Sequence, residues 1–150
     1  MKKVAIVTGG SRGIGRAIAV GLGEAGYAVV VAARTEVDAS AESAFARYAA
    51  GTVHDTARLV TDRGGTALAV RCALSRVDEI RDLVARTLGR FGRIDVLVNN
   101  AGIDCEGPVV DLDVELLDRC LAVNVRAPLL LAKFALPSML AQRSGSIVAL

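Results

Sequence analysis

The chain has 150 residues, of which 53% are hydrophobic and 3% aromatic, and its 18 basic and 16 acidic side chains give a formal net charge of +2. A chain of this length is typical of one domain and can bury roughly 70% of the surface that its unfolded form exposes. The apolar fraction excludes a disordered chain, and the small net charge and few aromatic side chains argue against a nucleic-acid partner.

The N-terminus places two lysines before an apolar run, as a secretory signal peptide does. The run over residues 4–7 stops at Thr8-Gly9-Gly10 with no cleavage pattern after it, so we expect a cytoplasmic protein. No apolar run approaches the length of about 18 residues needed for a membrane span, so we expect no membrane partner. The three cysteines are odd in number and lack metal-ligand spacing, and we interpret them as small hydrophobic residues: Cys72, Cys105 and Cys120.

Five short segments have the composition of strands buried on both faces. They are residues 4–7, 27–33, 66–72, 94–99 and 146–150. Strands of this kind form parallel sheets that are covered by helices on both sides.

Helical periodicity fills the intervals between these strands. Apolar residues recur from Ile14 to Leu22, with Gly26 as the C-cap, and a second helix is expected over residues 52–63. Ser75 with Asp78 predicts a capping box at the start of a third helix. A longer helix is expected over residues 114–140, with Pro128 and Pro137 kinking or breaking it.

This alternation predicts a single α/β domain over residues 1–150, with a Rossmann-type, doubly wound parallel sheet in the strand order 3-2-1-4-5. Residues 34–51 fit the alternation poorly, because they are too long for a strand-to-helix turn and have no clean period. We interpret them as a surface insertion.

A glycine-rich segment, Thr8-Gly9-Gly10-Ser11-Arg12-Gly13-Ile14-Gly15, lies where the first strand gives way to the first helix. Glycines allow a sharp turn and a close backbone approach, and the free N–H groups of a helix start favour a phosphate. A Walker A loop is the competing interpretation, but Arg16-Ala17 occupies the positions where Lys and Ser/Thr are required. A tight turn without a ligand is the other alternative.

The pattern Thr8-Gly9-x-x-x-Gly13-x-Gly15 resembles the cofactor loop of the short-chain dehydrogenase/reductase family. Asn99-Asn100-Ala101-Gly102 follows the fourth strand and resembles that family's second signature, and Asn124 falls in the next helix. The resemblance covers the chain except residues 34–51. It implies hydride transfer between a nicotinamide nucleotide and a small-molecule carbonyl or alcohol, by a protein that forms homo-oligomers. The implied cofactor-binding residues are Thr8, Gly9, Ser11, Arg12, Gly13, Ile14, Gly15, Arg34, Thr35, Asn99, Asn100, Ala101 and Gly102.

The end of the second strand indicates which nucleotide is preferred. Arg34 stands where an acidic residue would bind the ribose hydroxyls, and an arginine favours a 2′-phosphate, with Arg12 as a second cation. We therefore expect NADP(H) rather than NAD(H). Both arginines could instead be solvated, and Glu36 or Asp38 could still serve NAD(H). After the third strand, the resemblance implies an Asp that binds adenine, but this chain has Ala73 at that position.

Asn124 is the one candidate catalytic residue. Its spacing from Leu117 and Leu121 predicts a buried helix face, where its amide must be paired. The resemblance implies that it bends the helix and lets a backbone carbonyl hold a water of a proton relay. A helix kink without chemistry is the alternative.

The rest of the implied relay is not in the chain. Neither Tyr27 nor Tyr48 is followed four residues later by a lysine, and the one histidine, His54, is expected on the surface. We expect the chain to be the N-terminal, cofactor-binding portion of a longer reductase. The alternative is a non-catalytic module for dinucleotide binding or assembly.

Overall fold

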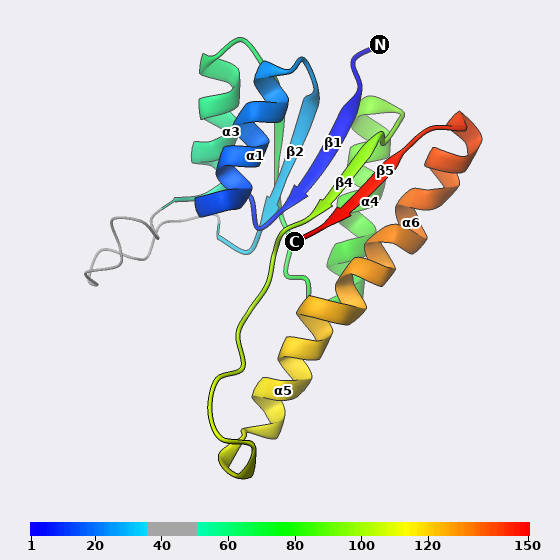
Figure 1. The fold of residues 1–150 in the computed structure, drawn as a ribbon. Helices are drawn as coiled ribbons and strands as arrows, with labels where there is room; N and C mark the ends of the chain where they lie inside the picture. The colour runs from blue at the N-terminus through cyan, green and yellow to red at the C-terminus, as the bar shows by residue number, and fades with distance from the viewer. Residues whose placement is uncertain (36–50) are drawn as a thin grey trace.

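The computed structural model describes residues 1–35 and 51–150, which form a five-stranded sheet with helices on both faces (Figure 1). The strands are β1 (Val4–Thr8), β2 (Ala28–Ala33), β3 (Thr66–Arg71), β4 (Val96–Asn99) and β5 (Ser146–Ala149). The helices are α1 (Gly13–Glu24), α3 (Val53–Asp62), α4 (Val77–Phe91), α5 (Val114–Leu121) and α6 (Ala127–Gln142), with a short 3-10 helix η1 (Val109–Asp111) and a π-helical turn η2 (Ala122–Arg126).

The sheet order is β3-β2-β1-β4-β5, and every neighbouring pair is parallel. The predicted Rossmann-type order is therefore confirmed. β1 and β4 are neighbours at the centre of the sheet. From β1 the chain adds β2 and β3 on one side, and from β4 it adds β5 on the other. Loops that leave such a switch point separate to opposite faces and open a crevice at the carboxyl edge of the sheet.

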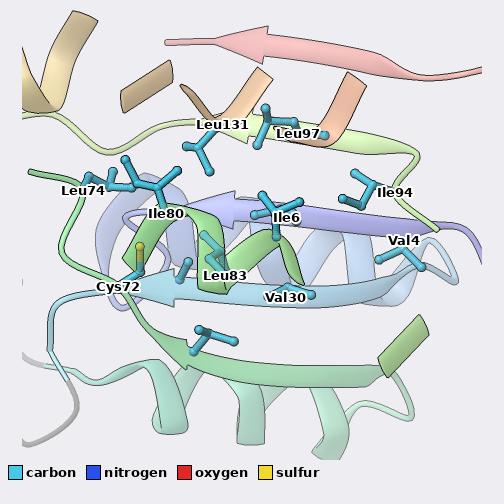
Figure 2. Close-up of a cluster of buried hydrophobic side chains, with 14 of the residues drawn as sticks. Val4, Ile6, Val30, Cys72, Leu74, Ile80, Leu83, Ile94, Leu97 and Leu131 are labelled. Carbon is cyan, nitrogen blue, oxygen red and sulfur yellow. The ribbon is translucent and has the colours of Figure 1, made fainter. Parts of the chain in front are cut away.

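Alternate residues of β1, β2, β3 and β4 face two separate cores, whereas β5, which the sequence predicts to be buried on both faces, is exposed along its whole length. One core lies between the sheet and the helices α4 and α6, where Ile6, Val30 and Leu97 pack with Leu83 and Leu131 (Figure 2). The other lies under α1 and α3 and includes Val7, Val29, Val31 and Val98 from the strands. The middle strands are thus apolar on both faces because both faces are covered.

The start of β1 is held by a buried carboxylate from the segment before β4. Asp95 Oδ2 accepts from the Val4 N–H at 2.8 Å, and the Arg93 guanidinium donates to both carboxylate oxygens. These hydrogen bonds from Arg93, with that from Val4, hold the pKa of the Asp95 carboxyl below its usual value despite its burial.

Helix α1 ends at Glu24 with Ala25 as its C-cap, and Gly26, the predicted C-cap, follows one residue later in the left-handed conformation. Gly26 has φ +88°, and its N–H donates to the Gly23 carbonyl while the Tyr27 N–H donates to the Leu22 carbonyl, each at 3.0 Å. This is the Schellman arrangement, which needs a left-handed residue after the helix.

The predicted capping box at Ser75 and Asp78 is wrong. Helix α4 begins after Arg76, with no side-chain cap, and Asp78 instead accepts from the Arg76 guanidinium at 3.0 Å. A capping box is present at α3, where Thr52 Oγ1 accepts from the Asp55 N–H and the Asp55 carboxylate accepts from the Thr52 N–H. The residue spacing is the same, but Leu74 and Ser75 lie in a turn in which the Arg76 N–H donates to the Ala73 carbonyl at 2.9 Å, so the helix begins one residue later.

Neither Pro128 nor Pro137 breaks the long helix. α5, η2 and α6 run on without interruption, and the irregularity is the π-helical turn around Asn124. Pro128 lies in the first turn of α6, next to this turn, and Pro137 is accommodated inside α6.

This continuous helix, Val114–Gln142, has 29 residues and contains a window of mean hydropathy 1.4, so by length and composition alone it could cross a membrane. No unbroken apolar run of this length indicates such a helix in the sequence, because single polar residues interrupt it. A helix that covers a sheet passes the same test, and one face of α6 packs into the core through Ala127, Leu131, Ala135 and Met139.

The proposed insertion over residues 34–51 lies largely outside the described residues, and so do Glu36 and Asp38. Of the expected cysteine environments, Cys72 and Cys120 are buried and Cys105 is half-buried, and all three thiols are free. His54 is exposed, as expected.

Candidate functional site

A cleft of about 200 Å³ opens at the carboxyl edge of the sheet. Its walls come from the loops after β1, β2, β3 and β4 and from the helix that begins at Val114. The residues around it are Gly9, Ser11, Arg12, Ala32, Ala33, Arg34, Thr35, Cys72, Leu74, Ser75, Asn100, Ala101, Gly102, Ile103, Arg119 and Val123. Both sequence signatures therefore meet at one place, although about 90 residues separate them in the chain.

Thr8 connects the glycine-rich segment to the Asn99–Gly102 segment by hydrogen bonds. Its buried hydroxyl donates to the Val98 carbonyl at 3.2 Å and accepts from the N–H groups of Asn100 and Ala101, each at 3.1 Å. The side-chain amide of Asn100 also donates to the Thr8 carbonyl at 2.9 Å. Thr8 thus fixes the loop after β4 against the end of β1 without lining the cleft itself.

Close backbone approach explains two of the glycines. A Cβ on Gly15 would overlap the Gly9 carbonyl and the Asn100 amide, and a Cβ on Gly9 would meet Asn100 Nδ2 at 2.8 Å. Gly9 also has φ +65°. These glycines bring the start of α1 directly against the carboxyl edge of β1 and β4.

The N-terminus of α1 has no side-chain cap. Its N-cap, Arg12, has extended backbone and makes no capping hydrogen bond, and no acidic residue lies in the first turn. Gly13 and Ile14 are exposed at this end of the helix. Uncapped N–H groups with the positive end of a helix dipole suit an anion such as a phosphate.

The backbone of Ser11 is held by hydrogen bonds from Arg16 and Thr56, which are called the polar brace below. Its carbonyl accepts from the Arg16 guanidinium and from Thr56 Oγ1, and Arg16 Nε also donates to Thr56 Oγ1 at 3.1 Å. This brace links the glycine-rich loop to α3 and fixes the backbone of the loop in place.

Two cationic side chains line the cleft near the end of β2. Arg34 is exposed directly after β2, and Arg12 approaches from the glycine-rich loop. Thr35 lies beside Arg34, and its carbonyl accepts from the Val53 N–H at 3.0 Å. The sequence-predicted pair of arginines is therefore brought to one cleft.

A second cleft of about 280 Å³ adjoins the first, beyond Gly102 and Ile103. Asn99 and Asn124 line it together with Asp104, Pro128, Ala149 and Leu150. Asn99 is buried, and its Oδ1 has no hydrogen-bond partner among the described residues. A buried amide oxygen without a hydrogen bond costs free energy, so Asn99 Oδ1 is an acceptor that a donor in this cleft could satisfy.

The predicted burial of Asn124 is wrong, whereas its predicted pairing is confirmed. The residue is exposed, because the turn η2 that carries it lies at the carboxyl ends of β4 and β5, where its side chain lines the second cleft instead of entering a core. Its amide pairs with the backbone of Ile103: Oδ1 accepts from the N–H at 3.0 Å, and Nδ2 donates to the carbonyl at 2.8 Å.

Some residues that line the first cleft are not among the site residues predicted from the sequence. Cys72, Leu74 and Ser75 follow β3, and their place at the carboxyl edge was available as a signal. Ile103 follows the signature after β4 and had the same signal, whereas Arg119 and Val123 had none, because only the path of the long helix past the sheet brings them there.

Burial raises the pKa of the Cys72 thiol to about 12, so this cysteine is a poor nucleophile.

Among residues 1–35 and 51–150, no group of three or more His, Cys, Asp or Glu side chains is placed to hold a metal ion. The polar groups at the clefts are amides, hydroxyls, backbone N–H groups and guanidiniums, with Asp104 the one carboxylate lining either of them within the described part of the chain. This set suits a phosphate-bearing organic ligand better than a bare cation.

The sheet order, the glycine-rich turn and the cleft at the switch point define a dinucleotide-binding α/β domain of the Rossmann type. The family model for short chain dehydrogenases matches residues 3–150, and the chain belongs to the short-chain dehydrogenase/reductase family.

Individual relatives agree with this assignment. The chain is 38% identical to the short chain dehydrogenase/reductase dpchG of Colletotrichum higginsianum, over 93% of this chain and 47% of that protein. It is 33% identical to 3-oxoacyl-[acyl-carrier-protein] reductase FabG of Staphylococcus epidermidis, over 99% of this chain and 55% of that protein. The chain thus spans about half the length of the curated relatives it matches.

Solved structures show the same correspondence. A metagenomic short-chain oxidoreductase in complex with NADP superposes with a TM-score of 0.84 at 37% identity, over 98% of this chain and 61% of that one. The F189W actinorhodin polyketide ketoreductase with NADPH gives a TM-score of 0.84 at 33% identity, over 99% of this chain and 52% of that one.

Proposed function

We propose that this chain is the nucleotide-binding part of an NADP(H)-dependent oxidoreductase that acts on a small carbonyl or alcohol substrate. The observation that carries the proposal is the pairing of Arg12 and Arg34 at one cleft, which no carboxylate from the described residues lines. A 2′-phosphate is favoured by such a pair and would be repelled by an acidic residue. Relatives crystallised with NADP or NADPH support the same cofactor, and NAD(H) is the weaker ligand in this proposal.

The backbone around the first cleft suits a dinucleotide. The uncapped start of α1, at Gly13, Ile14 and Gly15, offers N–H groups to the pyrophosphate, and the bare backbone at Gly9 allows it to approach. Ser11 lines the same end of the cleft.

The remaining proposed contacts come from the ends of the neighbouring strands. Arg34 and Thr35 hold the adenosine ribose and its phosphate, while Asn100, Ala101 and Gly102 form the opposite wall. Thr8 and Asn99 act from behind this wall, Thr8 through its three hydrogen bonds and Asn99 through its buried amide.

When bound, the nicotinamide supplies or accepts the hydride that such an oxidoreductase transfers. Asn124 is the residue that this chain contributes on the substrate side. It lines the second cleft and holds Ile103, and we propose that its distorted helical turn leaves a backbone carbonyl for a water of a proton relay.

A fluorescence titration tests the cofactor assignment. NADPH should bind more tightly than NADH, and Arg34→Asp should remove about 1.5 to 3 kcal/mol of that preference, the value of a charged hydrogen bond. Arg86→Asp is the matched control, since Arg86 lies on α4 and lines neither cleft. Equal affinity of the parent chain for both nucleotides would refute the assignment.

Binding and turnover should be separable in this chain. Its sequence contains no tyrosine with a lysine four residues later, and a positioned acid typically accelerates such steps by about 10² to 10⁴-fold. The chain should therefore bind NADPH without oxidising it in the presence of ketones. Robust turnover would contradict this placement of the active site.

Partners and location complete the proposal. Exposed apolar side chains on α5 and α6, among them Leu121, Leu129 and Leu140, favour association with a second copy. A cytoplasmic location is supported by the three free thiols, which a reducing compartment maintains.

A further inference from the structure

The first cleft has a second cationic end, remote in sequence from both signatures. Leu74 and Ser75 form one wall after β3, while Arg119 and Val123 form the other, from α5 and η2. Arg119 and Val123 are four residues apart in one continuous helix, so they lie on the same face of it. This end of the cleft therefore combines one apolar side chain on each wall with a guanidinium.

The Arg119 guanidinium has no hydrogen bond or ion pair with any other described residue. Nearby arginines are engaged: Arg126 donates to the Ser75 carbonyl at 2.9 Å, and Arg71 and Arg76 both pair with Glu79. A guanidinium carries five N–H donors and no acceptor. Arg119 thus presents unused donors to the cleft.

No carboxylate of the described residues balances these donors. Glu79, on the neighbouring helix α4, accepts from the Ala73 N–H at 2.7 Å in addition to its two arginines, and it does not line the cleft. The side chain at position 73 is only a methyl group. The cleft therefore offers hydrogen-bond donors at this end and lacks an acidic acceptor.

Sheet order indicates which part of a nucleotide reaches this end. If the ribose phosphate lies at Arg34, as the proposed function on which this inference rests requires, the attached base extends toward the next strand outward, which is β3. Leu74 and Val123 would then flank the base, and Arg119 would meet its edge. Adenine presents an amino donor at C6, whereas hypoxanthine presents a carbonyl acceptor there.

We propose that Arg119 is a specificity-determining residue that binds the acceptor edge of the nucleotide base, so that this cleft accepts hypoxanthine at least as well as adenine. A base pocket that depended on a carboxylate would require the amino group of adenine. With the Arg119 guanidinium at the base and no carboxylate at position 73, this pocket favours an acceptor at C6.

The test compares the dissociation constants of NADPH and its hypoxanthine analogue by fluorescence titration. The parent chain should bind the analogue as tightly as NADPH or more tightly. Arg119→Ala should weaken the analogue by about 10-fold and NADPH by less, since one charged hydrogen bond is lost mainly by the carbonyl-bearing base. For Arg119→Gln, which keeps an N–H donor, the affinity for the analogue should lie between that of the parent chain and that of Arg119→Ala.

Two further variants complete the design. Ala73→Asp should shift the preference toward adenine by supplying an acceptor, and Arg86→Ala should change neither affinity. An unchanged ratio in Arg119→Ala, or an equal loss for both nucleotides, would overturn the role of Arg119 while leaving NADP(H) binding intact. Failure of the parent chain to bind either nucleotide would instead overturn the proposed function.

Discussion

The side chain of Asn124 is hydrogen-bonded to both backbone polar groups of Ile103. One amide thereby joins a π-helical turn to the loop that follows β4, at the boundary between the two clefts. The Ile103 carbonyl also accepts a weak hydrogen bond from the Cys120 thiol at 3.7 Å. The loop after the second signature is thus positioned by the helix rather than by the sheet.

Replacing Asn124 with leucine should free this loop. Both hydrogen bonds to Ile103 are lost, and the expected loss in free energy of unfolding is about 1 to 2 kcal/mol, because the site is exposed and water replaces part of the pairing. Urea denaturation measures the change. Val125→Ala, at the next exposed position, is the control, and equal stability of Asn124→Leu and the parent chain would contradict the role of the amide.

Gly15 and Gly21 should respond oppositely to alanine. At Gly15 the new methyl group meets the backbone of Gly9, which cannot move without opening the β1 turn, whereas at Gly21 it enters open space. Gly15→Ala should destabilise the chain and weaken nucleotide binding, while Gly21→Ala should stabilise the same helix by about 0.5 to 1 kcal/mol. Thermal melting and NADPH titration measure the two effects. Two variants of equal stability would refute the close approach.

Asp95 should make the stability of the fold depend on acid. Hydrogen bonds from Arg93 hold the pKa of the folded carboxyl below its ordinary value. The stabilisation is therefore present above the unfolded pKa, near about 3.9, and is lost as the pH falls through the folded pKa.

Asp95→Asn should cost about 1.5 to 3 kcal/mol at neutral pH and flatten the dependence of stability on pH between about 5 and 2. Denaturant midpoints measured across this range provide the readout. Asp62→Asn, at an exposed carboxylate with no ion pair to a described residue, should leave the profile in place. A parent profile that is already flat below pH 5 would exclude the effect.

The cysteines should react with thiol reagents in a defined order. Burial raises the pKa of the Cys72 thiol to about 12, and burial together with a hydrogen bond to Cys105 raises the pKa of the Cys120 thiol. Cys105 is the most accessible of the three. Mass spectrometry after brief alkylation should find Cys105 modified first and Cys72 last, with the difference abolished in denaturant. Early modification of Cys72 in the native chain would show that its core position is wrong.

Self-association should depend on the exposed apolar face of η2 and α6. Val125, Leu129, Leu136 and Leu140 are spaced four, seven and four residues apart and are all exposed. Changing Leu129 and Leu140 together to lysine should lower the mass measured by light scattering at high concentration. The control replaces Val109 and Val110, which are equally apolar and exposed at η1, by lysine. A monomeric parent chain at high concentration would count against the interface.

Local patterns were sufficient for the sheet and for much of the site. Strands apolar on both faces required a covered parallel sheet, and the glycines of the first turn with the arginine after β2 predicted where a phosphate-bearing ligand would approach. These features depend on residues close together in the chain. That is why Thr8, Gly15 and Arg34 could be singled out before their surroundings were known.

Tertiary structure decided what periodicity could not. Asn124 lies on an apolar spacing, yet it is exposed, because the helix passes beyond the sheet and its burial depends on what lies opposite. The capping box formed at Thr52 and not at Ser75 because Ser75 lies in a turn after β3 and helix α4 begins one residue later, after Arg76. Arg119 reaches the cleft only through the path of α5, a contact between segments that are far apart in sequence. Sequence determines which groups are available, and the three-dimensional path of the chain determines which of them meet.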